Sequence, residues 1–140
     1  MAISVMVMYT RRPDFSPDQF KTYMEHTHLP IIKEVMGSQY PAKYPRRYVE
    51  RVQSGAGDRL GAPGASRKNC DPEDPVMLVG SPKTLEWDMM GEMIFRDELH
   101  LQQCLALVNS MEGQRIKDDE ENFTIPHLLK VALIGESFEE

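Results

Sequence analysis

The sequence predicts an α+β fold with one four-stranded antiparallel sheet. Two segments, residues 3–9 and 87–95, alternate as strands do and are largely apolar on both faces, which is typical of central strands. A helix start at Ser16 follows the first of these segments directly. Together these features predict a central sheet against which helices pack.

Composition indicates one globular domain that spans residues 1–140. A chain of 140 residues is long enough to bury a core and suits one such domain. The net charge of −6 argues against nucleic acid, and no stretch approaches the roughly 20 apolar residues of a membrane span. The chain begins with a strand rather than a signal peptide, and its two cysteines do not make a disulfide framework. We expect a cytoplasmic protein with no nucleic-acid or membrane partner.

The first strand and the helix after it are clearly marked in the sequence. Tyr9 is the last residue of the strand, and its side chain carries a hydroxyl group. Ser16 can accept a hydrogen bond from the backbone of Gln19, and Pro17 suits the first helical position, which makes an S-x-x-Q capping box. We therefore expect a helix that begins at Ser16.

Two histidines near the end of this helix point in different directions. At roughly 100° per residue, His28 falls on the buried face and His26 points toward water. Pro30 cannot donate to the carbonyl of His26, so the helix should kink or loosen there. A loosened turn would let His28 open into an apolar cavity, whereas a straight helix would bury it among the residues that share its face, Phe20, Met24, Thr27, Ile31 and Val35. Glu25 could orient the ring or remain a solvated carboxylate.

The middle of the chain is less regular. Residues 46–52 have the composition of an edge strand or a half-exposed strand. Residues 54–75 are rich in glycine, proline and charge, and we expect a long loop that is either a lid or a mobile insertion. Residues 76–80 follow as a possible short accessory strand.

The second central strand carries two carboxylates on one of its apolar faces. Asp88 and Glu92 both point to this face, and a buried charge is costly unless it is paired or protonated. Two alternatives remain open at this point. The carboxylates either pair with Arg47 or Arg51, or they line a pocket.

Two helices and a final strand complete the chain. Residues 97–110 and 112–123 have helical patterns, and the acidic run within the second one is most simply a solvated face. Residues 127–136 form the last strand, with His127 at its start. The order strand, helix, strand, strand, helix, strand is the split βαβ arrangement of ferredoxin-like folds, with all helices on one face of the sheet. Because the other face is apolar, we expect a second copy to cover it and form a homodimer with face-to-face sheets.

Three segments, taken in order, resemble a known family. They are YTRRPDFSPDQFKTYMEHTHLPII, WDMMGEMIFRD and EGQRIKDDEENF. From its first strand to its last the chain resembles the EthD domain of the dimeric α/β-barrel superfamily, in which the S-P-x-x-F helix and a closing H-x-P recur. Here His28 and Pro30 occupy that closing motif, and Asp88 and Glu92 lie where the family's third strand carries acidic groups. The R-R-Y at 46–48 and the long Gly/Pro loop are similar to the fungal branch associated with aromatic polyketide pathways.

The resemblance implies chemistry without a cofactor. Relatives decarboxylate polyketide-derived aromatic or β-keto acids, and others in the superfamily cyclise, dehydrate or oxidise polyketides. We therefore expect a cofactor-independent decarboxylase, a lyase, that acts on a small aromatic polyketide in secondary-metabolite biosynthesis. The alternatives are a dehydratase or cyclase of the same fold and a non-catalytic barrel that binds a hydrophobic ligand. No metal site is expected, because His26 and His28 point to different sides and no third ligand lies at a recognised spacing.

The expected reaction suggests a role for each candidate residue. His28 is the expected general acid/base, since histidine is the residue type best suited to proton transfer near neutral pH. Asp88 or Glu92 would hold the imidazole in one tautomer or, if protonated, bind a substrate hydroxyl. Tyr9 could donate to a phenolate, and Arg47 or Arg51 could anchor the carboxylate. The expected substrate-binding residues are therefore Tyr9, Tyr23, Arg47, Arg51 and His127.

Overall fold

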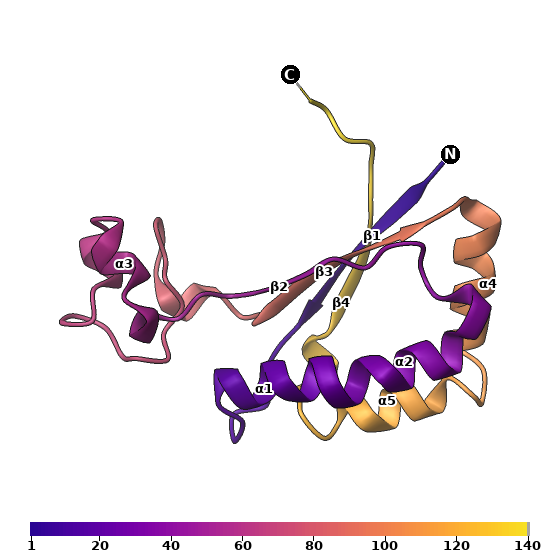
Figure 1. Ribbon diagram of the computed structural model, residues 1–140, viewed down its shortest axis with the longest axis horizontal. Coiled ribbons are helices and arrows are strands. Elements are labelled where there is room, and N and C mark those ends of the chain that lie inside the picture. The colour runs from indigo at the N-terminus through magenta and orange to yellow at the C-terminus, as the bar shows by residue number, and fades with distance from the viewer. Residues whose placement is uncertain (140) are drawn as a thin grey trace.

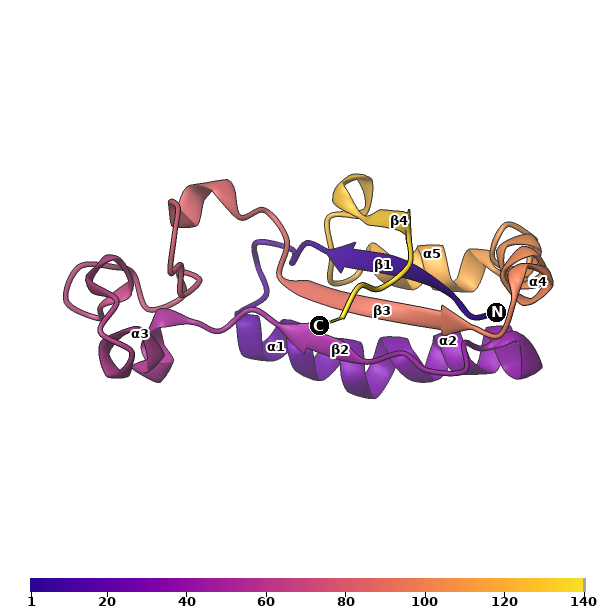
Figure 2. The ribbon, with the colours of Figure 1, turned by 90° about the horizontal axis from the view of Figure 1, so that it is seen from above.

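A computed structural model describes residues 1–139 and contains one four-stranded sheet (Figures 1 and 2). The strands are β1 (Ile3–Tyr9), β2 (Arg46–Tyr48), β3 (Met89–Phe95) and β4 (Lys130–Ile134). Their order across the sheet is β2-β3-β1-β4, and every neighbouring pair is antiparallel. This is the ferredoxin-like arrangement of a split βαβ unit, so the fold prediction is confirmed.

The main helices lie on one face of the sheet, as Figure 1 shows. They are α1 (Pro17–Tyr23), a π-helix (Met24–His28), α2 (Leu29–Met36), α4 (Glu98–Val108) and α5 (Gln114–Glu120). The remaining helical pieces are short: α3 (Ala56–Arg59) and the 3-10 turns Gly37–Gln39, Val52–Ser54, Pro63–Ala65, Pro82–Thr84 and Pro126–Leu128. Within residues 1–139, no helix is both long and apolar enough to cross a membrane.

The core lies between β1 and the helices. Val5, Val7 and Tyr9 of β1 point toward the helices and are buried. In the register, Val7 stands opposite Gly91 of β3, and the ring of Tyr44 packs against this glycine. A Cβ atom at position 91 would lie only 2.5 Å from Cε1 of Tyr44, so the missing side chain makes room for an aromatic ring of the core.

The first helical segment changes its hydrogen-bond pattern just before Pro30. The capping box is present, because Ser16 Oγ accepts from the Gln19 amide at 3.1 Å and Gln19 Oε1 accepts from the Ser16 amide at 2.8 Å. At the far end, the Leu29 amide donates to the Met24 carbonyl five residues earlier, which is a π-helical bond. Pro30 has no amide to donate to the His26 carbonyl. The predicted loosening of the helix is therefore confirmed.

Three strands are shorter than predicted. β2 covers only Arg46–Tyr48, and β3 begins at Met89 rather than at residue 87. β4 covers only Lys130–Ile134, because the residues before it form a 3-10 turn at Pro126–Leu128. The predicted accessory strand at 76–80 is wrong. The Val76 amide bonds to the Glu50 carbonyl at 2.8 Å, but Gly80 has a φ of +97° and turns the chain away from any partner strand.

The insertion at 54–75 is more ordered than a plain loop. It contains α3 and the 3-10 turn Pro63–Ala65, and the side chain of Ala65 is almost fully buried. In both ribbon views the insertion projects beyond the end of the sheet, away from α4 and α5 (Figures 1 and 2). It therefore packs mainly on itself.

Candidate functional site

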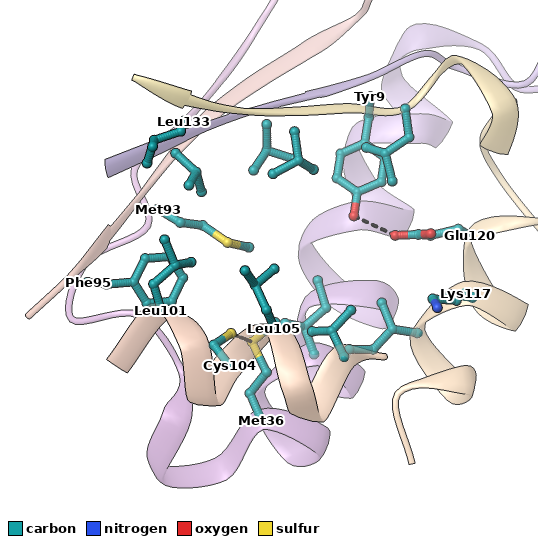
Figure 3. A pocket seen from close by; sticks show the side chains of 17 residues that line it. Tyr9, Met36, Met93, Phe95, Leu101, Cys104, Leu105, Lys117, Glu120 and Leu133 are labelled. Carbon is teal, nitrogen blue, oxygen red and sulfur yellow. Dashed lines mark hydrogen bonds between the residues drawn. The ribbon is translucent and has the colours of Figure 1, made fainter. Parts of the chain in front are cut away.

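An apolar cavity of about 430 Å3 lies between the sheet and the helices (Figure 3). Its walls come from β1, β3, β4, α2, α4 and α5, and include Val5, Val7, Met93, Leu101, Leu105 and Val131. The cavity opens beside β4, because Val131 and Leu133 remain 55% and 71% exposed although they point to the helix side of the sheet. The insertion at 54–75 contributes no residue to the wall, so the structure does not place it as a lid on this cavity.

Tyr9 and Glu120 form the polar end of the cavity (Figure 3). Both residues are buried, and the Tyr9 hydroxyl donates to Glu120 Oε2 at 2.8 Å. Burial raises the pKa of Tyr9 well above its ordinary value, and the neighbouring Glu120 carboxylate raises it further. Tyr9 is therefore a neutral hydrogen-bond donor at any physiological pH.

His28 lies directly behind this pair and is completely buried. Its Nε2 atom is 3.4 Å from the Tyr9 hydroxyl and 3.7 Å from Glu120 Oε2, while its Nδ1 atom is 2.8 Å from Asp119 Oδ2. The ring of Phe123 packs against the imidazole, with 4.9 Å between the ring centroids. The imidazole is not part of the cavity wall, so the expected direct opening of His28 into the cavity is wrong. Phe123, Tyr9 and Glu120 close the space around it.

Asp119 fixes the orientation of the imidazole. Burial alone would raise the pKa of Asp119, but hydrogen bonds from Tyr23, His28 and Asn122 together hold that pKa below its usual value. Tyr23 donates to Asp119 Oδ1 at 2.7 Å and Asn122 donates to the same oxygen at 3.2 Å. Because an ionised carboxylate only accepts, Nδ1 of His28 carries the proton and Nε2 faces Glu120 and Tyr9.

Two adjacent residues of α5 thus face the two nitrogens of one imidazole, Asp119 in hydrogen-bond contact at 2.8 Å and Glu120 at 3.7 Å. Asp119 and Glu120 lie between Ile116 and Phe123, at the spacing i, i+3, i+4, i+7 of a buried helix face. This acidic run was expected to be a solvated face, and for these two residues that expectation is wrong. The available signal was their position on the same stripe as Ile116 and Phe123, because a carboxylate on a buried stripe requires a polar partner.

Asp88 and Glu92 do not contact His28. The side chain of Asp88 pairs with Arg51 and accepts from the Arg11 amide at 2.6 Å, so the predicted pairing with Arg51 is confirmed. Glu92 stands opposite Met6 on the sheet face away from the helices. The expectation that one of these carboxylates orients the imidazole is therefore wrong, because Asp119 occupies that place.

The other predicted residues are spread over the molecule. Arg47 is exposed, opposite Met90 in the register, and His127 is exposed in the turn before β4. Arg51 contacts Asp88 rather than the cavity. Tyr23 does not line the cavity, and it reaches the site through its bond to Asp119 and by stacking on Phe123, with 4.6 Å between the ring centroids. The structure thus brings together His28, Tyr9 and Tyr23 from the predicted set.

Glu25 does not orient the imidazole either. It binds the guanidinium of Arg46 through two hydrogen bonds, at 2.8 and 2.9 Å, and also accepts from the hydroxyl of Tyr48. The hydrogen bond from Arg46 is the main reason why the pKa of Glu25 is lowered.

Within the part of the chain that the structure describes, no three His, Cys, Asp or Glu side chains are grouped so as to hold a metal ion.

Comparison with known proteins places the chain in a family. Residues 12–127 match the EthD domain. The chain belongs to the EthD domain family. An ethyl tert-butyl ether D (EthD) family protein from Bacillus halodurans is 19% identical, with 98% of this chain and 100% of that chain covered and a TM-score of 0.55. An EthD-like protein from Ralstonia eutropha JMP134 is 18% identical, with 94% and 89% covered and a TM-score of 0.52.

These solved structures share the fold with this EthD domain, and at such identity they support nothing beyond the fold. Among curated proteins, no sequence matches the chain significantly. The matched segment of the EthD domain contains His28, Asp119 and Glu120, whereas Tyr9 precedes it.

Proposed function

We propose that this EthD domain is a cofactor-independent decarboxylase that acts on a polyketide-derived aromatic or β-keto carboxylic acid. One observation carries the proposal. The hydrogen-bonded pair of Tyr9 and Glu120 is the polar end of an otherwise apolar cavity, and the His28–Asp119 pair stands directly behind it. A flat hydrophobic acid that enters the cavity would therefore contact Glu120 as the acid/base group, and His28 behind it could supply Glu120 with a proton.

The cavity suits such a substrate in size and chemistry. Small-molecule sites typically measure about 300–1,000 Å3 and have apolar walls with a few polar groups, and this cavity of about 430 Å3 falls in that range. Apolar walls bind the rings by excluding water. The low local polarity also strengthens any hydrogen bond or charge interaction that forms as the reaction proceeds.

Proton transfer to carbon is the step assigned to Glu120. In an ortho-hydroxy aryl acid, the Glu120 carboxylate first takes a proton from a protonated His28 and then gives it to the ring carbon that bears the substrate carboxylate. The carbon–carboxylate bond then breaks, carbon dioxide leaves, and the bonding electron pair restores the aromatic ring. In a β-keto acid, the proton goes to the keto oxygen and the same electron pair forms an enol. The neutral hydroxyl of Tyr9 stabilises the carboxylate that Glu120 becomes.

Each turnover consumes one proton, and His28 is placed to replace it. Its Nε2 atom is 3.7 Å from Glu120 Oε2, so a protonated imidazole can return a proton to Glu120. Asp119 stabilises the imidazolium through Nδ1. Asp119 also contacts Asn122, which is exposed, and this contact links the buried pair to solvent.

A dehydratase or cyclase is the alternative function. Both reactions need one acid/base group in an apolar cavity, and Glu120 with His28 could serve them equally. The mass of the product separates the three reactions, because decarboxylation removes carbon dioxide, dehydration removes water and cyclisation changes no mass. A binding protein without activity would release every acid unchanged.

The decisive assay incubates purified protein with anthraquinone- or anthrone-type carboxylic acids, without metal or nucleotide, and follows carbon dioxide loss by mass spectrometry. We expect Glu120→Gln to lower kcat by about 10²–10⁴-fold, since it removes the transferable proton. His28→Gln should lower kcat by about 10²-fold, since it removes the residue that returns a proton to Glu120. The matched control is Asp118→Asn, which changes an exposed carboxylate on the same helix and should keep full activity. Full turnover by Glu120→Gln on an accepted acid would contradict the site, and unchanged acids throughout would contradict the decarboxylase.

A further inference from the structure

Among residues 1–139, one cationic side chain lines the cavity. Lys117 of α5 lines the cavity near Glu120, on the side where Tyr9 and Glu120 meet (Figure 3). The arginines expected to bind a carboxylate are elsewhere, because Arg51 pairs with Asp88 and Arg47 lies outside the cavity. Among residues 1–139, Lys117 has no ion-pair partner within 4.0 Å. Its charge is therefore available to a bound molecule.

The position of Lys117 relative to Glu120 is suited to an aryl carboxylic acid. The two residues are three apart on α5, and such pairs have about 5–6 Å between their Cβ atoms on one helix face. In the proposed reaction the carbon that loses carbon dioxide is also the carbon that receives the proton. The group that holds the carboxylate and the group that delivers the proton must therefore lie close together, as Lys117 and Glu120 do.

We propose that Lys117 binds the substrate carboxylate at the mouth of the cavity and so selects planar aromatic anions over their neutral analogues. This inference rests on the proposed function and names the residue that sets its substrate class. The apolar wall takes the rings, and the ammonium group of Lys117 holds the carboxylate while its carbon faces Glu120. Lys117 is a specificity-determining residue, and the proton still comes from Glu120.

The exposure of Lys117 fits this role. An exposed ammonium group keeps much of its hydration, so it attracts a carboxylate without a large desolvation cost and binds it only moderately. A stronger, buried cation would stabilise the substrate more than the transition state and slow carbon dioxide loss. Because the product has no carboxylate, it loses this contact and leaves more readily than the substrate.

The test measures binding separately from turnover. The probes are anthraquinone-2-carboxylic acid and its neutral carboxamide, which have no hydroxyl group next to the carboxyl carbon to promote decarboxylation. Their affinities for the wild-type protein, Lys117→Met and Lys117→Arg are measured by calorimetry. We expect Lys117→Met to weaken binding of the acid by about three- to tenfold and to leave the carboxamide unchanged. Lys117→Arg should stay within about twofold of wild type.

The control is Lys83→Met, which removes the same charge from an exposed turn outside the cavity and should leave both affinities unchanged. With an accepted substrate, Lys117→Met should raise KM more than it lowers kcat. Equal affinity of Lys117→Met and wild type for the acid overturns the inference, as does a wild-type protein that binds the carboxamide as well as the acid or binds neither. These results concern binding alone, so failure of the decarboxylase assay is a separate outcome.

Discussion

At the scale of single residues, the site depends on how one buried imidazole is satisfied. A fully buried histidine needs a partner at each nitrogen, and here Asp119 contacts Nδ1 while Tyr9 and Glu120 approach Nε2. Substrate would touch Tyr9 and Glu120, and His28 would act through them. In the proposed mechanism the general acid expected at His28 is therefore Glu120, and His28 is the residue that would supply its proton.

The lowered pKa of Asp119 predicts how stability changes with pH. A carboxyl group whose pKa is lower in the folded than in the unfolded protein stabilises the fold above its unfolded pKa, and that contribution is lost as pH falls through the folded pKa. The loss should therefore occur below about pH 4, the pH at which an ordinary aspartate is half protonated.

Urea unfolding of wild type and Asp119→Asn measures this effect. At pH 7 we expect the variant to be less stable by about 1–2 kcal/mol, because the charged hydrogen bonds to Tyr23 and His28 are weakened. Toward pH 3 the difference should shrink, since the unfolded wild-type chain then takes up a proton on Asp119 more readily than the folded protein does. A difference that stays constant over this range would contradict the assigned pKa direction.

At the scale of elements, α1 was predicted well and α5 was not. The capping box and Pro30 act through local backbone chemistry, so the sequence is sufficient to predict the helix start and the loosened turn. The role of α5 depends on tertiary contacts. Asp119 and Glu120 lie in what reads as a solvated acidic run, and their position on the stripe of Ile116 and Phe123 indicates burial but not which residue they contact. That they face His28 follows only from the tertiary packing.

The contact between β3 and Tyr44 gives a prediction at this scale. Gly91→Ala would place a methyl group 2.5 Å from the buried ring of Tyr44, so the ring must move or the strand must shift. We expect a loss of about 1–3 kcal/mol in the free energy of unfolding, measured with urea. The control is Gly64→Ala, where the added atom meets nothing within 4 Å. Equal stability of the two variants would contradict this prediction, because it would mean that the ring of Tyr44 moves aside without a loss in the free energy of unfolding.

At the scale of the whole molecule, element order was enough to predict the topology. The sequence of strands and helices admits few antiparallel arrangements, and the observed order β2-β3-β1-β4 is one of them. The position of the cavity was not predictable, because it depends on how far α4 and α5 stand from β4. The partners of Asp88 were predictable only as alternatives, since pairing and pocket roles give the same strand pattern.

The sheet face away from the helices leads to the expectation of a homodimer. Met6, Met8, Met90 and Ile94 point to this face and are only partly buried in one copy. We expect a second copy to cover them, because a contiguous apolar surface in water favours association.

Light scattering after size-exclusion chromatography tests the dimer. Met6→Asp should convert the dimer to a monomer, since it places a charge in the centre of the contact, beside Glu92. Met111→Asp makes the same change at an exposed position outside the sheet and should leave the dimer intact. Circular dichroism confirms that both variants fold. A monomeric wild type, or a folded Met6→Asp dimer, would contradict the expectation.

The π-helix at Met24–His28 has a consequence for aligning this chain with its relatives. A π turn contains one residue more than an α turn does. Compared with a relative whose helix is uninterrupted, all positions after this turn are therefore displaced by one. An alignment without a gap at the turn would match either Phe20 or Ile32 to the wrong partner. A single-residue gap inside Met24–His28 aligns the residues on both sides of the turn correctly. The residue aligned with His28 is then the one that occupies the same position in the relative's structure.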